Sequence, residues 1–189
     1  MGNVGAVKTG TGLKALDLVY ISIGAALISI CSWVSIPTAV PFTLQTFAVF
    51  FVLLLLGGKR GTTAICIYVL VGAVGVPVFS GFKGGIGILL GNTGGYIWGF
   101  LFIGLIYMLF TRFSKKSIII KVISLVIGLV VCYVFGTAWF MNVYIHNSGE
   151  VGLITVLGWC VFPFIIPDLL KLALAVMITK RIAPVIKTT

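Results

Sequence analysis

Charged and metal-binding side chains are scarce in this chain of 189 residues. Charged residues make up 8% of the sequence, with three acidic side chains, thirteen basic ones and a single histidine, His146. So few carboxylates and imidazoles leave little material for a metal centre or a hydrolase site. The four cysteines fall singly, without CxxC spacing, as small buried apolar side chains often do. The sequence therefore predicts no metal, no cofactor and no catalytic residue.

Motifs of nucleotide-binding proteins are missing as well. The glycines of SGFKGGIGILLG depart from the GxGxxG spacing, and GAVKTGTG near the start lacks the Lys–Ser/Thr ending of a phosphate loop. His146 lies near Glu150 with no serine or cysteine nucleophile motif beside it. The net charge of +10 comes from basic residues placed between apolar runs. This placement is typical of membrane topology signals and does not indicate a nucleic-acid surface.

Apolar residues dominate the chain, at 60% of the sequence with a mean hydropathy of +1.27, and they predict an integral membrane protein. Because a hydrocarbon core about 30 Å thick takes about 20 residues of helix, six segments qualify as membrane spans. No repeat, heptad seam or low-complexity linker divides them, so we expect one membrane domain over residues 16–183. The spans are Leu16–Ile36, Thr43–Gly57, Gly61–Val76, Thr93–Phe110, Ile118–Met141 and Phe164–Ile182.

Basic residues orient the predicted bundle, because lysine and arginine are retained in short cytoplasmic loops. With both ends of the chain in the cytoplasm, eleven of the thirteen basic residues fall on that side. Of the other two, Lys83 lies in an external loop and Lys171 within the last span. We therefore expect an all-α bundle of six transmembrane helices in a cell membrane, with cytoplasmic tails at residues 1–15 and 184–189.

The three expected external connections are apolar. They contain IPTAVPFTLQ, VPVFSGFKGGIGILLGN and VGLITVLGWCVFPF, and such segments fold over the mouth of a bundle when protein or a cavity buries their backbone. In the second connection, glycine permits close approach of the backbone either to a ligand or to a neighbouring helix. The sequence leaves both explanations open.

The strongest candidate for a functional site is the pair Asp168 and Lys171 in IPDLLK. Ionisable residues within a membrane span are costly and are functional hypotheses by default. With Pro167 expected as the first helical residue, the i,i+3 spacing places both charges on one face, in the outer third of the bundle. The alternative is an ion pair that only neutralises charge at a helix end.

Further polar residues stand at the same expected external level. Thr43 and Gln45 begin the second span, and Asn92 and Tyr96 begin the fourth, where helix capping and an interfacial position are the alternative explanations. Together with the charged pair they offer a carboxylate, an ammonium, amides and hydroxyls beside aromatic side chains. Such a set suits a small polar-headed molecule that is bound without being transformed.

Four motifs, in this order, closely resemble those of one family: VPFTLQTF, LLLGGKRG, GVPVFSGFKGGIGILLGNTGGYIWGF and IPDLLK. Over roughly residues 16 to 183, the chain resembles the BioY family, the biotin-specific substrate-binding (S) components of energy-coupling-factor (ECF) transporters. The resemblance implies high-affinity capture of biotin from outside, and coupling to a transmembrane T component with two ATPase subunits. Asn92 stands where members often have proline, and Lys83 where many have arginine.

The resemblance also implies roles for the candidate residues. Asp168 would accept hydrogen bonds from the ureido N–H groups of biotin, and Lys171, Asn92 or Tyr96 would donate to its carbonyl. Lys83, or backbone N–H groups of the glycine-rich loop, would hold the valerate carboxylate.

Docking on the T component would use small residues of the first helix, as two i,i+4 pairs: Ser22 with Ala26, and Ala25 with Ser29. From the residues alone, packing inside the bundle is the simpler explanation of both pairs. Three other functions stay open: an S component for another small vitamin, a small intramembrane enzyme with Asp168 and Lys171 as acid and base, and a structural membrane subunit without a ligand. The missing nucleophile weighs against the enzyme.

Overall fold

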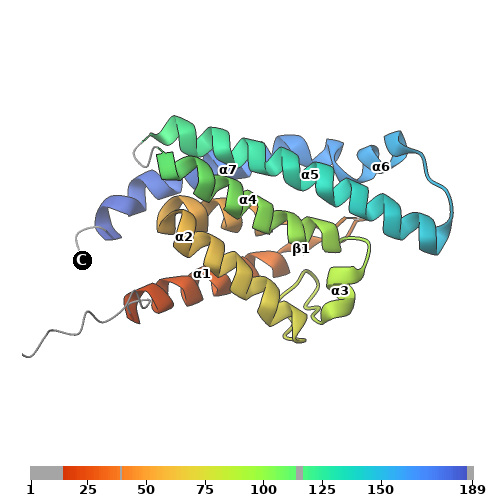
Figure 1. The fold of residues 1–189 in the computed structure, drawn as a ribbon, viewed down its shortest axis with the longest axis horizontal. Coiled ribbons are helices and arrows are strands. Elements are labelled where there is room, and N and C mark those ends of the chain that lie inside the picture. The colour runs from red at the N-terminus through yellow and green to blue at the C-terminus, as the bar shows by residue number, and fades with distance from the viewer. Residues whose placement is uncertain (1–14, 39, 114–116, 187–189) are drawn as a thin grey trace, which may run out of the picture.

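The computed structural model describes residues 15–38, 40–113 and 117–186, which form a bundle of α-helices with one short β-hairpin (Figure 1). Within these residues, five helical stretches are long and apolar enough to cross a membrane: α1, α2, α4, α5, and α6 together with α7. The prediction of a helical membrane protein is confirmed at this level. The elements are α1 Ala15–Trp33, β1 Ser35–Ile36, β2 Phe42–Thr43, α2 Gln45–Ala73, α3 Ile86–Leu90, α4 Gly94–Phe113, α5 Ile118–Ser148, α6 Leu153–Cys160 and α7 Phe162–Ile186.

Helix α2 folds back on itself at Gly57. This residue has φ 81° and ψ 172°, a conformation that glycine adopts readily and other residues rarely do. Beyond it, Gly61 packs against the backbone of Leu53, and the Gln45 amide donates to the hydroxyl of Tyr68 at 2.5 Å. Residues that far apart in sequence meet only if the two arms run antiparallel, and the arms match the two separate segments that the sequence predicts.

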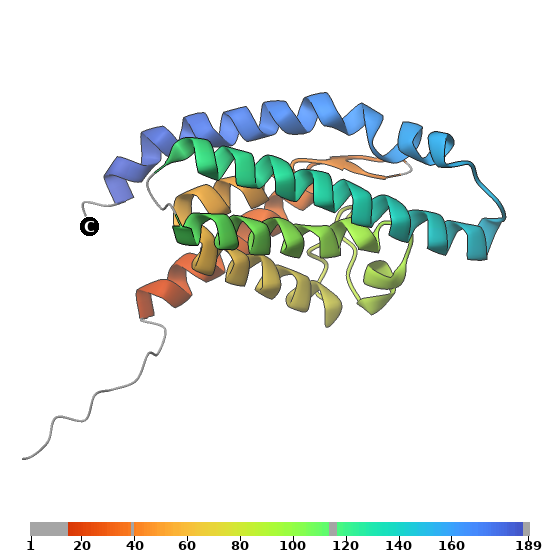
Figure 2. The same ribbon diagram turned by 45° about the horizontal axis from the view of Figure 1, so that its top comes forward.

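Both ends of the described chain lie at one end of the bundle. Figures 1 and 2 show the start of α1, the turn within α2, the end of α4, the start of α5 and the end of α7 at that end, with α3 and α6 toward the other. There, Arg60 from the turn of α2 forms an ion pair with Asp17 from the first turn of α1. The other end therefore carries the loops and short elements that cover the bundle.

Several helix boundaries differ from the prediction. The first helix stops at Trp33, and Ser35–Ile36 pairs with Phe42–Thr43 as the β1–β2 hairpin, where an irregular connection was expected. Helix α5 runs on to Ser148. The expected tail at 1–15 lies outside the described residues except for Ala15, which begins α1, and residues 184–186 of the other expected tail continue α7.

The predicted start of the last helix at Pro167 is wrong. Helix α7 begins at Phe162, and the backbone N–H groups of Phe164 and Ile165 both bond to the carbonyl of Val161. Pro163 occupies the first turn, where a missing N–H costs nothing. The earlier start leaves Pro167 inside the helix, one turn further on.

Helix α4 packs closely on α5 through glycine. A Cβ at Gly95 would lie 2.4 Å from the Cβ of Trp139, and the indole of Trp139 donates to the carbonyl of Gly91 at 3.0 Å. At Gly95 the structure therefore supports the helix-packing explanation of the glycine-rich segment.

We predict that Gly95→Ala destabilises the protein, because the added methyl group forces α4 away from Trp139. Gly87→Ala in α3 is the matched control, since a Cβ there would meet nothing within 4 Å. Both changes gain similar helix propensity, so their difference isolates the overpacking, which costs about 1–3 kcal/mol. Denaturation of the two purified variants in detergent measures it, and equal stability would contradict the packing role.

Candidate functional site

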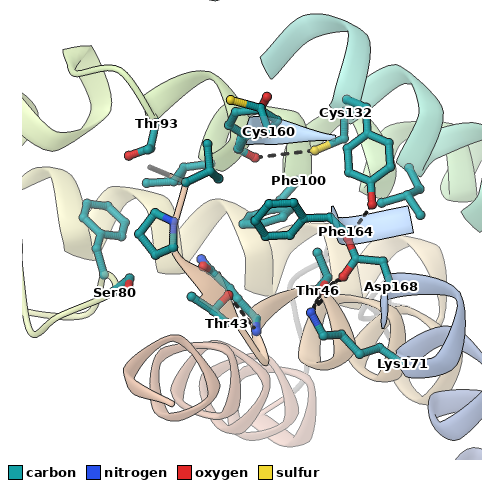
Figure 3. Close-up of a pocket in the computed structure, with 18 of the residues that line it drawn as sticks. Thr43, Thr46, Ser80, Thr93, Phe100, Cys132, Cys160, Phe164, Asp168 and Lys171 are labelled. Atoms are coloured by element: carbon teal, nitrogen blue, oxygen red, sulfur yellow. Dashed lines mark hydrogen bonds and ion pairs between the residues drawn. The ribbon is translucent and has the colours of Figure 1, made fainter. Parts of the chain in front are cut away.

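A cavity of about 160 Å³ lies toward the end of the bundle opposite the two chain ends (Figure 1), between the β1–β2 hairpin, the loop before α3, and helices α2, α4, α5 and α7. Figure 3 shows Thr46, Asp168 and Lys171 together at one side of it, Ser80 and Thr93 at the other, and aromatic side chains between them. The cavity thus has two polar regions separated by an apolar one. The apolar lining includes Val40, Phe79, Ile88, Ile97, Phe100, Leu129 and Phe164.

Asp168 is the centre of the first polar region and is only 2% exposed. Its Oδ1 accepts hydrogen bonds from the Lys171 ammonium and the Thr46 hydroxyl, both at 2.8 Å. Its Oδ2 accepts one from the Tyr133 hydroxyl at 2.6 Å. A buried carboxylate is tolerated when it is paired and hydrogen-bonded, and donors from three helices meet that requirement.

Lys171 is buried beside Asp168 and 7% exposed. Besides its ion pair, the ammonium donates to the Thr46 hydroxyl at 3.2 Å and lies 4.2 Å from the ring centroid of Phe42. The aromatic face adds a favourable cation–π contact in place of water. The i,i+3 geometry that the sequence predicts is confirmed, and both charges point into the protein.

Six of the seven residues proposed from sequence line this cavity: Thr43, Gln45, Lys83, Tyr96, Asp168 and Lys171. Asn92 does not line it, although its neighbour Thr93 does. Gln45 and Tyr96 are also held in place, by Tyr68 and by the Thr137 hydroxyl at 3.1 Å respectively. The structure therefore gathers residues from four distant segments around one space.

Sequence reasoning missed Thr46 and Tyr133, the two hydroxyl donors to Asp168. Thr46 follows Gln45 directly in FTLQTF, so its type and position were visible while its partner was not. Tyr133 sits in the middle of an apolar span, where a phenol hydroxyl requires a hydrogen-bond partner. That requirement was the only signal in the sequence that marked it.

The second polar region is formed by Ser80, Lys83 and Thr93. The loop that carries Ser80 and Lys83 is attached to the end of α1. Ser32 donates to the carbonyl of Val78 at 2.5 Å, and the Trp33 indole donates to that of Pro77 at 2.9 Å. No glycine is among the described residues that line the cavity, so the loop presents side chains to it.

The predicted docking residues of α1 divide between two faces. Ser22 and Ala26 are exposed. Ala25 and Ser29 are each 8% exposed, and the Ser29 hydroxyl bonds to the carbonyl of Ala25. A shift of three residues rotates a position by about 60° around a helix, which turns this second pair toward the core. The burial of Ala25 and Ser29 favours packing inside the bundle for this pair, which is the simpler explanation given from the sequence.

We predict that Lys171→Met destabilises the protein by about 3–5 kcal/mol, because it leaves the Asp168 carboxylate buried without its counter-charge. The double variant Asp168→Asn/Lys171→Met removes both charges and recovers most of the loss. Lys180→Met on the exposed face of the same helix is the control. Denaturation in detergent compares the variants, and a Lys171→Met protein as stable as the control would disprove the dependence on the pair.

Comparisons with known proteins show what this chain is similar to. Residues 6–188 match the BioY family. The "Biotin transporter BioY" of Thermotoga maritima is 40% identical over 170 residues, covering 88% of this chain and 95% of the relative. The "Probable biotin transporter BioY" of Pyrococcus horikoshii is 37% identical over 171 residues, covering 90% and 98%.

A solved structure is also similar over most of the chain. The crystal structure of "the S-component for biotin from an ECF-type ABC transporter" gives a TM-score of 0.78 at 26% identity, covering 90% of this chain and 94% of that one. Since the family match extends over nearly the whole sequence, this chain belongs to the BioY family.

Proposed function

We propose that this chain is the biotin-binding S component of an ECF-type transporter, a multi-pass protein of the cell membrane that captures biotin from outside. The observation that carries the proposal is the cavity with a buried carboxylate–ammonium pair at one end, a lysine at the other, and an apolar middle. Biotin has the same order of groups, with a polar ureido ring, an apolar thiophane ring and chain, and a terminal carboxylate.

The hydrogen bonds that Asp168 and Lys171 already make determine how many of their acceptors and donors are left for a ligand. A carboxylate has about four acceptor sites and an ammonium has three donors. Asp168 uses two sites on Oδ1 and one on Oδ2, and Lys171 uses two donors. One acceptor on Asp168 and one donor on Lys171 stay available, which matches one N–H group and the C=O group of a cyclic urea.

The carboxylate of biotin is assigned to the second polar region. There, Lys83 provides a positive charge, and Ser80 and Thr93 provide hydroxyl donors. A carboxylate is the ligand group that the Lys83 ammonium would attract. Asn92, which lies beside the cavity and not in its wall, has no assigned contact.

The same proposal includes a topology of six spans with both termini in the cytoplasm. The two antiparallel arms of α2 count as two spans, and the basic residues Lys59, Arg60 and Arg112 belong to the end of the bundle where α1 begins and α7 ends. The positive-inside rule assigns that end to the cytoplasm. Energy for uptake would come from a T component and two ATPase subunits, with Ser22 and Ala26 on the docking face of α1.

We predict that two variants change binding of two ligands in different ways. Asp168→Asn weakens the binding of biotin and of biotin methyl ester equally, by a few kcal/mol, because it alters the group that holds the ureido ring. Lys83→Met weakens biotin by about 1–2 kcal/mol, five- to thirtyfold, and leaves the methyl ester unchanged, because the ester has no charge to pair. Calorimetry on detergent-solubilised protein without ATP or metal measures all four affinities.

The control for this experiment is Lys180→Met, which leaves both affinities at the wild-type value. Unchanged affinity for biotin in Asp168→Asn would sink the assigned site. Failure of the wild-type protein to bind biotin, while it binds another vitamin, would replace the ligand and keep the transporter class.

The topology makes a separate prediction. A green fluorescent protein fused to the C-terminus is fluorescent in bacterial cells, because it folds in the cytoplasm, whereas alkaline phosphatase fused there is inactive. Alkaline phosphatase fused after Gly149, in the connection between α5 and α6, is active because that connection is external. Five spans would place the two termini on opposite sides, so an active phosphatase at the C-terminus refutes the six-span arrangement.

A further inference from the structure

A second cavity, of about 630 Å³, lies between α5, α6 and α7 and is roughly four times the volume of the ligand cavity. We call it the α5–α7 groove; it is lined by residues of α5 between 126 and 141, by Leu153 and Leu157 of α6, and by Ile165 and Leu169 of α7. Figure 2 shows α6 and α7 running alongside α5. The groove is open at its surface, since Val134 is 67% and Leu153 54% exposed.

The chemistry of the lining excludes water as the occupant. Its hydroxyl groups are those of Tyr133 and Thr137, and both are engaged elsewhere, with Asp168 at 2.6 Å and with Tyr96 at 3.1 Å. Water enters a cavity when it finds two or more polar partners there. An empty space of this size would forfeit dispersion contacts along its whole wall. A hydrocarbon group is therefore the occupant that the groove would bind most favourably.

The position and length of the groove specify which hydrocarbon. All of its walls belong to helices that are long and apolar enough to span the membrane, so it opens into the acyl region of the bilayer. From Val126 to Met141 it follows α5 for about 22 Å, compared with about 15 Å for half of the hydrocarbon core. We propose that the α5–α7 groove binds one acyl chain of a membrane phospholipid, lying along α5.

The groove and the ligand cavity share part of their walls, Leu129 and Tyr133. The Tyr133 ring faces the groove while its hydroxyl bonds to Asp168. An acyl chain behind the ring would hold that hydroxyl on the carboxylate. This coupling rests on the proposed biotin site. Through Tyr133, the bound acyl chain would support Asp168, the residue proposed to bind the ureido ring.

Photo-crosslinking tests the site. The full-length protein is placed in nanodiscs of phosphatidylcholine and phosphatidylglycerol that contain a small fraction of phospholipid with a diazirine on its acyl chain, and adducts are mapped by mass spectrometry. We expect adducts on the groove residues of α5, α6 and α7 to exceed, several-fold, those on Leu105 and Leu109, exposed apolar residues of α4. Adducts in proportion to exposure around the whole bundle would overturn the proposal.

Matched variants make the test specific. Val134→Trp fills the groove from an exposed position that does not disturb the core, and it lowers the groove adducts while those on α4 stay unchanged. Leu105→Trp adds the same side chain on α4, outside the groove, and leaves the groove adducts unchanged. Thermal denaturation confirms that both proteins are folded. Equal numbers of groove adducts in the wild-type protein and in Val134→Trp would then also overturn the proposal.

Biotin affinity in the same samples tests the coupling. Removing lipid with detergent weakens biotin binding several-fold in the wild type and less in Val134→Trp, whose indole replaces the chain behind Tyr133. If the affinity for biotin does not depend on lipid while the groove adducts persist, the acyl-chain site is supported and the coupling is refuted. If no biotin binds under any condition while the adducts persist, the proposed function has failed and the lipid site has not.

Discussion

The buried ion pair between Asp168 and Lys171 is the interaction on which the site depends. A carboxylate at 2% exposure persists only with its donors in place, and here the donors come from three different helices. Thr46 belongs to α2, Tyr133 to α5 and Lys171 to α7 itself. Because each donor must reach the same two oxygens, the pair ties α7 to the bundle and fixes the position of three helices around the cavity.

Two further features of the chain shape the cavity around this pair. The turn at Gly57 brings the arms of α2 together, so that Gln45 at the start of the helix meets Tyr68 near its end. The attachment of the 76–83 loop to Ser32 and Trp33 brings Lys83 over the far side of the same cavity. A polar region at each end of an apolar space follows from these two constraints.

Tyr133 lies at a boundary between two environments. Its hydroxyl bonds to a buried carboxylate and the residue also lines an apolar groove, so one amphipathic side chain stands between the polar cavity and the groove. In a membrane the cost of an unpaired polar group is high and lipid supplies apolar contacts freely. A phenol suits this position because it satisfies both sides at once.

The sequence by itself determined the membrane class, the approximate helical segments, the charged pair and four further residues that line the cavity, Thr43, Gln45, Lys83 and Tyr96. Hydropathy and helical spacing carry these features, since apolar runs and the i,i+3 offset of Asp168 and Lys171 are local properties of the chain. Only the tertiary structure decided which side chains satisfy the carboxylate, which face of α1 holds Ala25 and Ser29, and that α7 begins at Phe162 and not at Pro167. Thr46 and Tyr133 are more than thirty residues away from Asp168 in sequence, and a hydrogen bond over that separation leaves no periodic trace. These hydrogen bonds form because the buried carboxylate requires donors and the folded helices place the two hydroxyl groups within reach of it.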